Sequence, residues 1–557
     1  MAEPPIFKPG GGSRFGTHVS NWKRLFFAPC RGEHGNERHR IDSTRKNNNE
    51  PPEYRQIYRA ERRMNRIRRA FFMATLEQYL ALLIGLVTLA TMARLLTPAE
   101  IGLGVIGLGI GTITFSLREF ASPDFLIKRD HVDTEDVRTS FTILLVLTTG
   151  LALLLYLGRE WLADFYHDGS LVYFLDLIII AAFVETLSLP TIALLRRDMA
   201  FGVLARIRTA GSVIASLTTI GFAFLGFGHM SFAFGLLAGA LTTTLLAFAA
   251  RPVMSIFQPS VSSLREALHF GSYMGATSVL NKVYDTLPQL LLGRIMTSTS
   301  VGIFNRANAI CGLPDRVFLS AVFSVAFPIL AEQVRQGQDL RQSYLRAISY
   351  ITVVYWPSQI LLALLAYPAV HIVLGGNWSE APPIVAILCL AGTFWFPVIL
   401  TYPLLIALGE NREAFVSNCI ARIVSAVVLC SASFWGLTAL ALSQFITLPF
   451  QMMISLYFVR KHVQFEWRDL LEAIRPSAVV TVSAMVGPVV VIAAHGFALD
   501  ISPLAGFFAG ILAIAGWLVA LIRTRHPFLT EIERVLHRTL PRLSLRKTGM
   551  SKVTPAE

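Results

Sequence analysis

The stretch ARLLTPAEIGL, residues 93–103, has a second copy in the chain, GRIMTSTSVGI at residues 293–303. Three identities align at an offset of 200 residues: Arg94 with Arg294, Thr97 with Thr297, and Gly102 with Gly302. Aliphatic residues align between them, and each copy falls at the turn between the first two of six apolar segments. The repeat therefore predicts two parallel six-helix lobes, related by an axis along the membrane normal, with a central cavity at their interface.

The composition is that of a polytopic membrane protein. Of the 557 residues 54% are hydrophobic and only 15% are charged, and the mean hydropathy is +0.55. A helix needs about 20 apolar residues to cross a bilayer, and about fourteen such runs follow one another with no period-2 alternation. We expect an all-α fold with spans beginning near residues 71, 99, 139, 170, 202, 230, 270, 299, 346, 382, 413, 436, 475 and 501.

The distribution of Lys and Arg predicts the orientation. If the N-terminus is cytoplasmic, the outward loops hold only Arg94, Arg159 and Arg294. The inward loops carry pairs and clusters: Lys128/Arg129, Arg196/Arg197, Arg335/Arg341 and Arg460/Lys461. By the positive-inside rule, both termini are expected in the cytoplasm.

The two ends of the chain are basic. Residues 1–70 hold sixteen Lys and Arg against seven Asp and Glu, with no apolar periodicity before residue 54. We predict a disordered cytoplasmic head at 1–70, lobes at 71–252 and 264–460, two additional transmembrane helices at 470–523, and a basic cytoplasmic tail at 524–557. The head would either bind anionic membrane lipids or serve only as an orientation signal, and nothing in it suggests a nucleic-acid partner.

Polar residues inside the apolar segments are the candidate site. The run VLNKVYDTLPQLLLG, residues 279–293, places Asn281, Lys282 and Asp285 on one flank of a helix. Because a charge in the bilayer core costs about 2.5 to 3.5 kcal/mol, these side chains should face protein or a wet cavity. Lys282 would there meet a substrate anion or, alternatively, form a structural pair with Asp285.

The next segment adds NRANAICGLPDR, residues 305–316, with Arg306, Asn308 and Arg316. Lys282, Arg306 and Arg316 on adjacent helices would form an anion-attracting wall, since a guanidinium matches phosphate and carboxylate oxygens. Arg306 could instead snorkel to the outer interface. Arg422, on a later helix, is a further candidate for the cavity.

Carboxylates in the apolar segments are candidates for ion coupling or gating. They are Asp285, Glu185 in the middle of the fourth span, and Glu77 in the first. Burial raises a carboxyl pKa toward neutrality, which suits a coupling proton. Structural hydrogen bonding is the alternative role for each of them.

Catalytic motifs are absent from the sequence. It has no HExxH, P-loop, GxSxG or DxD pattern, and the five cysteines show no CxxC spacing. The glycines of GLGVIGLGIG, residues 102–111, lie within the second span, where close helix packing explains them. We expect neither an enzyme nor a cofactor or metal, and no ATPase to drive transport.

Several segments, taken in order, resemble the bacterial polysaccharide transporter family, the Wzx-type flippases of the multidrug/oligosaccharidyl-lipid/polysaccharide exporter superfamily. The resemblance runs from about residue 70 to 460 and rests on ARLLTPAEIGL (93–103), FASPDFLIKRDHVDTEDVRTSF (120–141), PTIALLRRDMAF (190–201), LREALHFGSYMGATSVLN (264–281), LLLGRIMTSTSVGIFNRANAICGLP (290–314) and LLIALGENREA (404–414).

The resemblance implies transfer of an undecaprenyl-diphosphate-linked oligosaccharide across the bacterial inner membrane, for exopolysaccharide, capsule or O-antigen assembly. Expected partners are this lipid-linked substrate, membrane lipids and a polysaccharide polymerase or export machinery, with a monomer as the default state. The alternative is an ion-coupled multidrug antiporter of the same superfamily. Its mostly cationic substrates favour carboxylates over arginines, so the cation-rich seventh and eighth spans argue against it.

Overall fold

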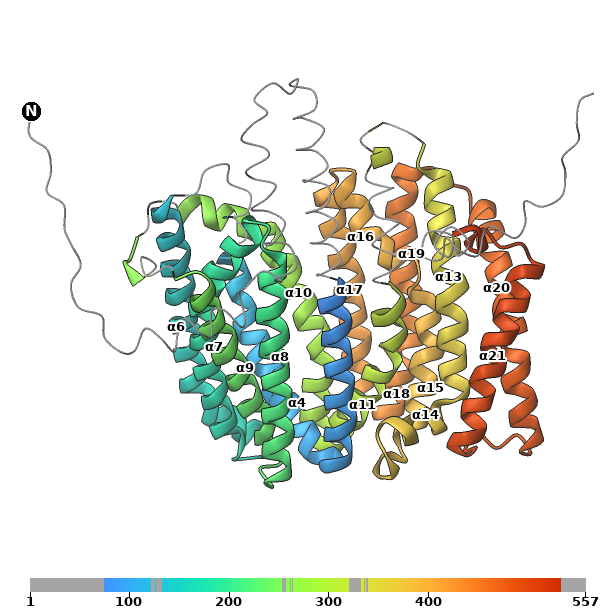
Figure 1. The fold of residues 1–557 in the computed structure, drawn as a ribbon, viewed down its shortest axis with the longest axis horizontal. Helices are drawn as coiled ribbons and strands as arrows, with labels where there is room; N and C mark the ends of the chain where they lie inside the picture. Colours follow the sequence, from blue (N-terminus) through green and yellow to red (C-terminus); the bar gives the residue numbers. More distant parts are fainter. Residues whose placement is uncertain are drawn as a thin grey trace, which may run out of the picture.

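The computed structural model describes residues 75–121, 126, 133–252, 257–260, 262, 264–319, 332–334, 336 and 339–531. Within these ranges the regular secondary structure is entirely helical. The helices form two lobes side by side, with the helices running in the same general direction (Figure 1). The predicted head at 1–70, most of the predicted tail, and Lys128, Arg129 and Arg335 lie outside the described residues.

The first lobe, called the N-lobe, comprises residues 75–252. It holds the helix Thr75–Leu95, α4 (Pro98–Ser116) with the 3-10 turn η1 (Leu117–Ala121), α6 (Thr134–Phe165), α7 (Leu171–Arg197), α8 (Phe201–Phe224) and α9 (Met230–Ala250). Its main packing pairs are α8 with α9, α7 with α9, and α6 with α7.

The second lobe, called the C-lobe, comprises residues 264–463. It holds α10 (Leu264–Ile295), α11 (Ser298–Cys311) with the π turn η3 (Asp315–Leu319), α13 (Arg341–Leu364), α14 (Ala366–Val373), η4 (Gly376–Trp378), α15 (Ala381–Gly392) with η5 (Thr393–Trp395), α16 (Val398–Ala407), α17 (Asn411–Ser433), α18 (Leu437–Leu442) and α19 (Gln444–Val463). The short helices pair into longer spans, such as Ala381–Ala407 and Leu437–Val463, so the C-lobe repeats the six-span plan of the N-lobe.

Two further helices, α20 (Trp467–Ala494) and α21 (Pro503–Arg523), pack on the C-lobe at its far side from the N-lobe (Figure 1). Both α20 and α21 contact α13. The Trp517 indole N–H donates to Val353 O at 2.8 Å, and Thr352 Oγ1 donates to Ser477 Oγ at 2.9 Å. Because these polar contacts are buried among apolar helices, they fix the pair in place.

Twelve helices of the described chain are long and apolar enough to cross a membrane. Their lipid-facing sides expose many large apolar residues, as expected of a protein in a bilayer. The expected number of fourteen is not confirmed by this measure. The other two expected spans coincide with α10, which is long but carries several polar residues, and with α11, which has only 14 residues.

The repeated turn seen in the sequence is a matched pair of helix N-caps. Thr97 Oγ1 accepts the Glu100 N–H at 3.3 Å, and Thr297 Oγ1 accepts the Ser300 N–H at 3.3 Å. In the N-lobe, Glu100 also accepts the Thr97 N–H at 2.9 Å and completes a capping box. Each cap stabilises its helix by about 1 kcal/mol, which explains why a threonine directly precedes both α4 and α11.

The other repeated residue, glycine, lets the two lobes meet at a seam between α4 and α11. A Cβ atom on Gly102 would lie 1.7 Å from Ser298 O, and one on Gly302 would lie 2.0 Å from Pro98 O. Only residues without a side chain allow the two helix starts to approach so closely. The further glycines of α4 also abut side chains of other helices, such as Gly107 against Phe174, which confirms the helix-packing interpretation of GLGVIGLGIG.

Candidate binding site between the lobes

Two pockets lie on one side of the membrane domain, where α4 ends and α17 begins; we call this the pocket side. The N-lobe pocket has a volume of about 590 Å³ and is lined by residues of the helix Thr75–Leu95 and of α4, α7, α8 and α9. The C-lobe pocket, of about 550 Å³, is lined by α10, α16, α17 and α19. The seam at Gly102 and Gly302 is at the opposite ends of these helices, which we call the sealed side.

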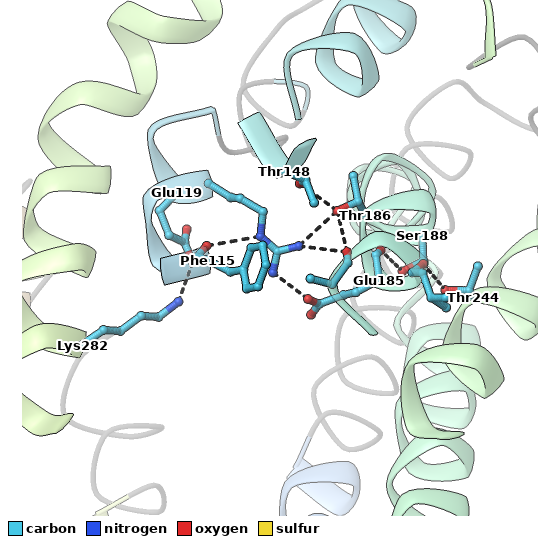
Figure 2. Close-up of polar contacts among 11 residues, drawn as sticks. Phe115, Glu119, Thr148, Glu185, Thr186, Ser188, Thr244 and Lys282 are labelled. Carbon is cyan, nitrogen blue, oxygen red and sulfur yellow. Dashed lines mark hydrogen bonds and ion pairs between the residues drawn. The ribbon is translucent and has the colours of Figure 1, made fainter. Parts of the chain in front are cut away.

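An ion pair marks the boundary between the pockets. Lys282 Nζ of α10 lies 3.1 Å from Glu119 Oε1 of η1, and each side chain is 40% exposed. Lys282 lines the N-lobe pocket, whereas Glu119 lines the C-lobe pocket. The pair therefore joins the two lobes through side chains that remain accessible to a ligand, and Figure 2 shows it beside the polar network of the N-lobe.

Arg118, the residue before Glu119, is held by oxygen atoms of α4 and α7. Its Nε donates to Phe115 O at 3.2 Å and its Nη1 to Ala182 O at 3.3 Å. Its Nη1 also reaches Thr186 Oγ1 at 3.1 Å, and its Nη2 lies 2.7 Å from Glu185 Oε2. These contacts fix the guanidinium at the wall of the N-lobe pocket, and Figure 2 shows the same network continuing toward Thr148 and Thr244.

A second pair in the N-lobe pocket is looser. Arg208 Nη1 of α8 lies 3.5 Å from Glu77 Oε1, at the limit of a hydrogen bond. The Arg208 side chain is 42% exposed, whereas that of Glu77 is 16% exposed. Arg208 is therefore a cation that an incoming anion could reach with little rearrangement.

In the C-lobe pocket, Arg422 of α17 lies between two aromatic rings. Its guanidinium carbon is 4.3 Å from the Tyr284 ring centroid and 5.6 Å from that of Trp395. Its Nη1 donates to Asp285 Oδ1 at 3.2 Å, and the arginine side chain is only 14% exposed. Cation–π contacts of this kind orient a guanidinium without using its N–H donors.

Amide side chains extend the polar surface of the C-lobe pocket. Asn418 Nδ2 donates to Asn281 Oδ1 at 3.0 Å, linking α17 to α10. Gln451 Nε2 of α19 donates to the Tyr284 hydroxyl at 3.0 Å and to Ser425 Oγ at 2.9 Å. A pocket lined by amides, hydroxyls and the Trp395 ring offers both donors and acceptors, together with a flat apolar face.

Charges around the two pockets balance. Lys282, Arg118, Arg208 and Arg422 each have a carboxylate partner, respectively Glu119, Glu185, Glu77 and Asp285. Neutral pairing lowers the cost of placing charge within a membrane domain. An anionic ligand must therefore compete with these carboxylates for the cations.

The structure contradicts one of the two expected partners of Lys282, the structural pair with Asp285. Although Lys282 and Asp285 are three residues apart on α10, they do not pair with each other. Lys282 meets Glu119 of the other lobe, and Asp285 meets Arg422 of α17. Both carboxylate bonds thus connect neighbouring elements instead of two turns of one helix.

Of the other expected site residues, Asn281 and Arg422 line the C-lobe pocket, and Glu77 and Glu185 line the N-lobe pocket. Arg306, Asn308 and Arg316 line neither of these two pockets. Asn308 and Arg316 are exposed, whereas Arg306 is 7% exposed. The burial of Arg306 excludes a side chain that snorkels to an interface, and the expected wall of Lys282, Arg306 and Arg316 is not assembled around either pocket.

The sequence analysis did not identify Arg208, Asn418 or Gln451 as site residues. Arg208 is the eighth residue of α8, within an apolar segment. A charge in such a segment was the sequence signal that could have identified it as a site residue. The two amides carry no charge, and their positions on two different helices, α17 and α19, give no linear pattern.

Two lobes of apolar helices, related by an internal repeat and joined by the ion pair Lys282–Glu119, make this chain a polytopic membrane protein of two-lobe architecture. Over residues 91–383 the chain matches the family described as polysaccharide biosynthesis protein. This match covers more than half of the 557 residues. The chain belongs to that family.

Relatives of this chain include two named for polysaccharide assembly. It is 26% identical over 337 residues to the succinoglycan biosynthesis transport protein ExoT of Rhizobium meliloti, covering 59% of this chain and 67% of the relative. It is 22% identical over 314 residues to the lipopolysaccharide biosynthesis protein WzxC of Escherichia coli, covering 56% and 63%. The chain thus matches about two thirds of the length of each of these relatives.

Solved structures share the fold. The lipid II flippase MurJ in an inward closed conformation has a TM-score of 0.65 at 14% identity, covering 85% of this chain and 99% of that chain. A multidrug resistance MATE transporter in an inward-facing conformation has a TM-score of 0.54 at 16% identity, covering 71% and 98%. These likenesses confirm the expected all-α membrane fold.

Proposed function

We propose that the protein flips an undecaprenyl-diphosphate-linked oligosaccharide from the cytoplasmic to the periplasmic leaflet of the bacterial inner membrane, with both termini in the cytoplasm. The observation that carries this proposal is the set of four cations at the two pockets, each paired with a carboxylate, of which Lys282 and Arg208 are accessible to a phosphate. The names of the family and of its relatives support polysaccharide assembly as the process. In this orientation the pocket side faces the cytoplasm.

We assign the diphosphate to the N-lobe pocket. Lys282 and Arg208 are the accessible cations there, with side chains 40% and 42% exposed. Arg118 is already committed to four oxygen atoms and contributes its field from the wall. Charge-assisted bonds from two cations to a diphosphate replace the bonds to Glu119 and Glu77, and the displaced carboxylates act as the gating groups.

We assign the sugars to the C-lobe pocket. Carbohydrates present hydroxyl groups that both donate and accept, which suits Asn281, Asn418 and Gln451. The apolar face of a pyranose suits a flat ring such as that of Trp395. The boundary pair Lys282–Glu119 then lies where diphosphate meets sugar, and the lipid tail stays in the bilayer while the lobes rock.

Deletion of the gene in its native bacterium tests the function. We expect surface polysaccharide to disappear and the lipid-linked repeat unit to accumulate on the cytoplasmic leaflet. Plasmid expression of the intact chain should restore polymer. Normal polymer in the deletion strain, in the absence of a second flippase gene, would contradict the proposal.

A second candidate, an ion-coupled multidrug antiporter, is favoured by the MATE-like fold and by the carboxylates in the pockets. Every one of those four carboxylates is neutralised by a cation, however, which weakens the attraction for a cationic drug. Drug sensitivity on deletion, with polysaccharide intact, would favour this candidate over the flippase.

A further inference from the structure

Arg306 is a buried charged residue that lines neither pocket. It lies on α11, eight residues after the helix start at Ser298, which places it about 12 Å inside the membrane domain. Its side chain is 7% exposed, its Nε has no hydrogen-bond partner, and no ion pair of the described residues includes it. Its helix neighbours Ile303, Ala307 and Ile310 are buried core residues.

The face of α11 that carries Arg306 is the face that closes the seam. Ser298, Gly302 and Arg306 follow one another at intervals of four and lie on one side of the helix. Ser298 and Gly302 meet the backbone of α4 at Gly102 and Pro98. Arg306 is therefore one turn deeper than the closest contact between the two lobes.

The internal repeat supports this placement. At the offset of 200 residues, Arg306 corresponds to Ile106 of α4. Ile106 is 1% exposed, and its Cδ1 lies 2.6 Å from where a Cβ on Gly293 would be, so it packs across the seam against the other lobe. The counterpart of Gly293 at this offset is Ala93 of the first helix, whose carbonyl accepts the Trp378 indole N–H of the C-lobe at 2.8 Å. From the repeat we infer that Arg306 is directed toward this part of the N-lobe.

A buried guanidinium whose Nε lacks a hydrogen-bond partner is costly. An apolar residue, Ile106, fills the matching place in the other lobe. A buried arginine of this kind is expected when its guanidinium has a role in another conformation of the protein. Alternating access requires the seam between α4 and α11 to part when the pocket side closes. Parting would bring Arg306 to the surface of a cavity open on the sealed side.

We propose that Arg306 is an anion-binding residue of the opposite conformational state, where it receives the diphosphate group as the seam opens. The inference rests on the proposed function. Burial of Arg306 in the present state then has a role. The charge without an ion-pair partner is inaccessible until the lobes move, and its hydration and its binding of phosphate favour the state that is open on the sealed side.

Three variants test the proposal: Arg306→Met, Arg306→Lys, and the control Arg341→Met, whose arginine pairs with Asp469 away from both pockets. Removing an unpaired buried charge should leave the thermal unfolding temperature of the purified protein equal or higher. We expect Arg306→Met nonetheless to reduce polymer export at least about tenfold, a change of 1.4 kcal/mol. Arg306→Lys should retain most of the export, and the control should retain all of it. Normal export by Arg306→Met at normal abundance would overturn the inference.

Chemical labelling provides a second measurement that does not require transport. Arg306→Cys is treated with a membrane-impermeant thiol reagent from the periplasm, alone and together with Gly302→Val, which forces the seam apart. We expect at least about fivefold more labelling at position 306 in the double variant, because a Cβ at position 302 cannot coexist with the closed seam. Equal labelling of the two proteins would overturn the inference.

Lys282→Met, assayed in parallel, separates the inference from the proposed function. Loss of export in Lys282→Met with normal export in Arg306→Met would overturn the role of Arg306 and leave the flippase standing. Normal export in the gene deletion strain would instead remove the flippase itself.

Discussion

The N-lobe pocket and the C-lobe pocket hold their arginines by different means. Arg118 in the N-lobe donates to four oxygen atoms of α4 and α7, two of them backbone carbonyls. Arg422 in the C-lobe is flanked by two aromatic rings and, within the described residues, donates to Asp285 alone. A guanidinium has five N–H donors, so Arg118 is mainly a part of the wall, whereas Arg422 keeps donors available for a ligand.

The two lobes therefore differ in the chemistry of their pockets, although their turns and caps repeat. The accessible cations Lys282 and Arg208 gather at the N-lobe pocket, and the amides and the Trp395 ring gather at the C-lobe pocket. A substrate with a charged and a neutral part can use both at once. The following variants test this division of roles.

The largest effect is expected from removing the accessible cations of the N-lobe pocket. Lys282→Met with Arg208→Met should reduce polymer export about 100-fold, since each charge-assisted hydrogen bond is worth about 1.5 to 3 kcal/mol. Binding of undecaprenyl diphosphate with and without sugars, measured by ligand-induced thermal stabilisation, should weaken alike. The control Lys282→Arg with Arg208→Lys retains both charges and should export polymer within about threefold of the native chain. An equal loss of export in this control would show that export depends on the side-chain geometry at these two positions and not on their charge.

The next largest effect is expected at the seam on which both pockets depend. Gly102→Val would drive a side chain into Ser298 O, which disfavours the state open on the pocket side. A shift of about 1.4 kcal/mol reduces the ratio of that state to the opposite state tenfold. Spin labels at the pocket-side ends of α8 in the N-lobe and α17 in the C-lobe should report a shorter separation. Gly150→Ala, on α6 with no atom within 4 Å of its Cβ position, is the matched control and should change neither separation nor export.

A smaller and more selective effect is expected in the C-lobe pocket. Asn281→Ala with Asn418→Ala removes an amide pair and should weaken binding of the glycosylated lipid about tenfold, because each hydrogen bond contributes about 0.5 to 1.5 kcal/mol. Binding of undecaprenyl diphosphate without sugars should be unchanged. Asn377→Ala, in η4 and outside both pockets, serves as the control. An equal loss for both ligands would contradict the separation of sugar from diphosphate.

The sequence predicted the lobes well because their signals are local. Apolar runs set the helices, and Thr97, Thr297, Gly102 and Gly302 repeat because the same cap and the same close approach are made twice. The sequence also predicted that Asn281 and Arg422 line the cavity, because polar side chains of an apolar helix should face protein or water and not lipid.

The partners of these residues could not be predicted from spacing. Lys282 and Asp285 share one flank of α10, yet each meets a residue more than 130 positions away in the sequence, Glu119 or Arg422. Such pairing depends on how the lobes and helices are docked, which no helical period encodes. For the same reason Arg306 could be recognised as unusual, but its position at the seam required the structure.

The smallest effect on export is expected for a polar cluster distant from both pockets, where α20 and α21 join α13. His526, just beyond α21, is 1% exposed and contacts Ser349 and Ser477 at 3.1 and 3.2 Å. Burial lowers the pKa of His526 from its usual 6.5 to about 4. Between these two values the unfolded chain binds the proton and the folded chain does not, so the free energy of unfolding falls as pH drops from 6.5 toward 4, by up to about 3 kcal/mol. Thermal unfolding of the purified protein across this range should show the decrease, and His526→Gln should flatten it while export at neutral pH stays near the native level. An unchanged pH dependence in His526→Gln would assign it to other groups.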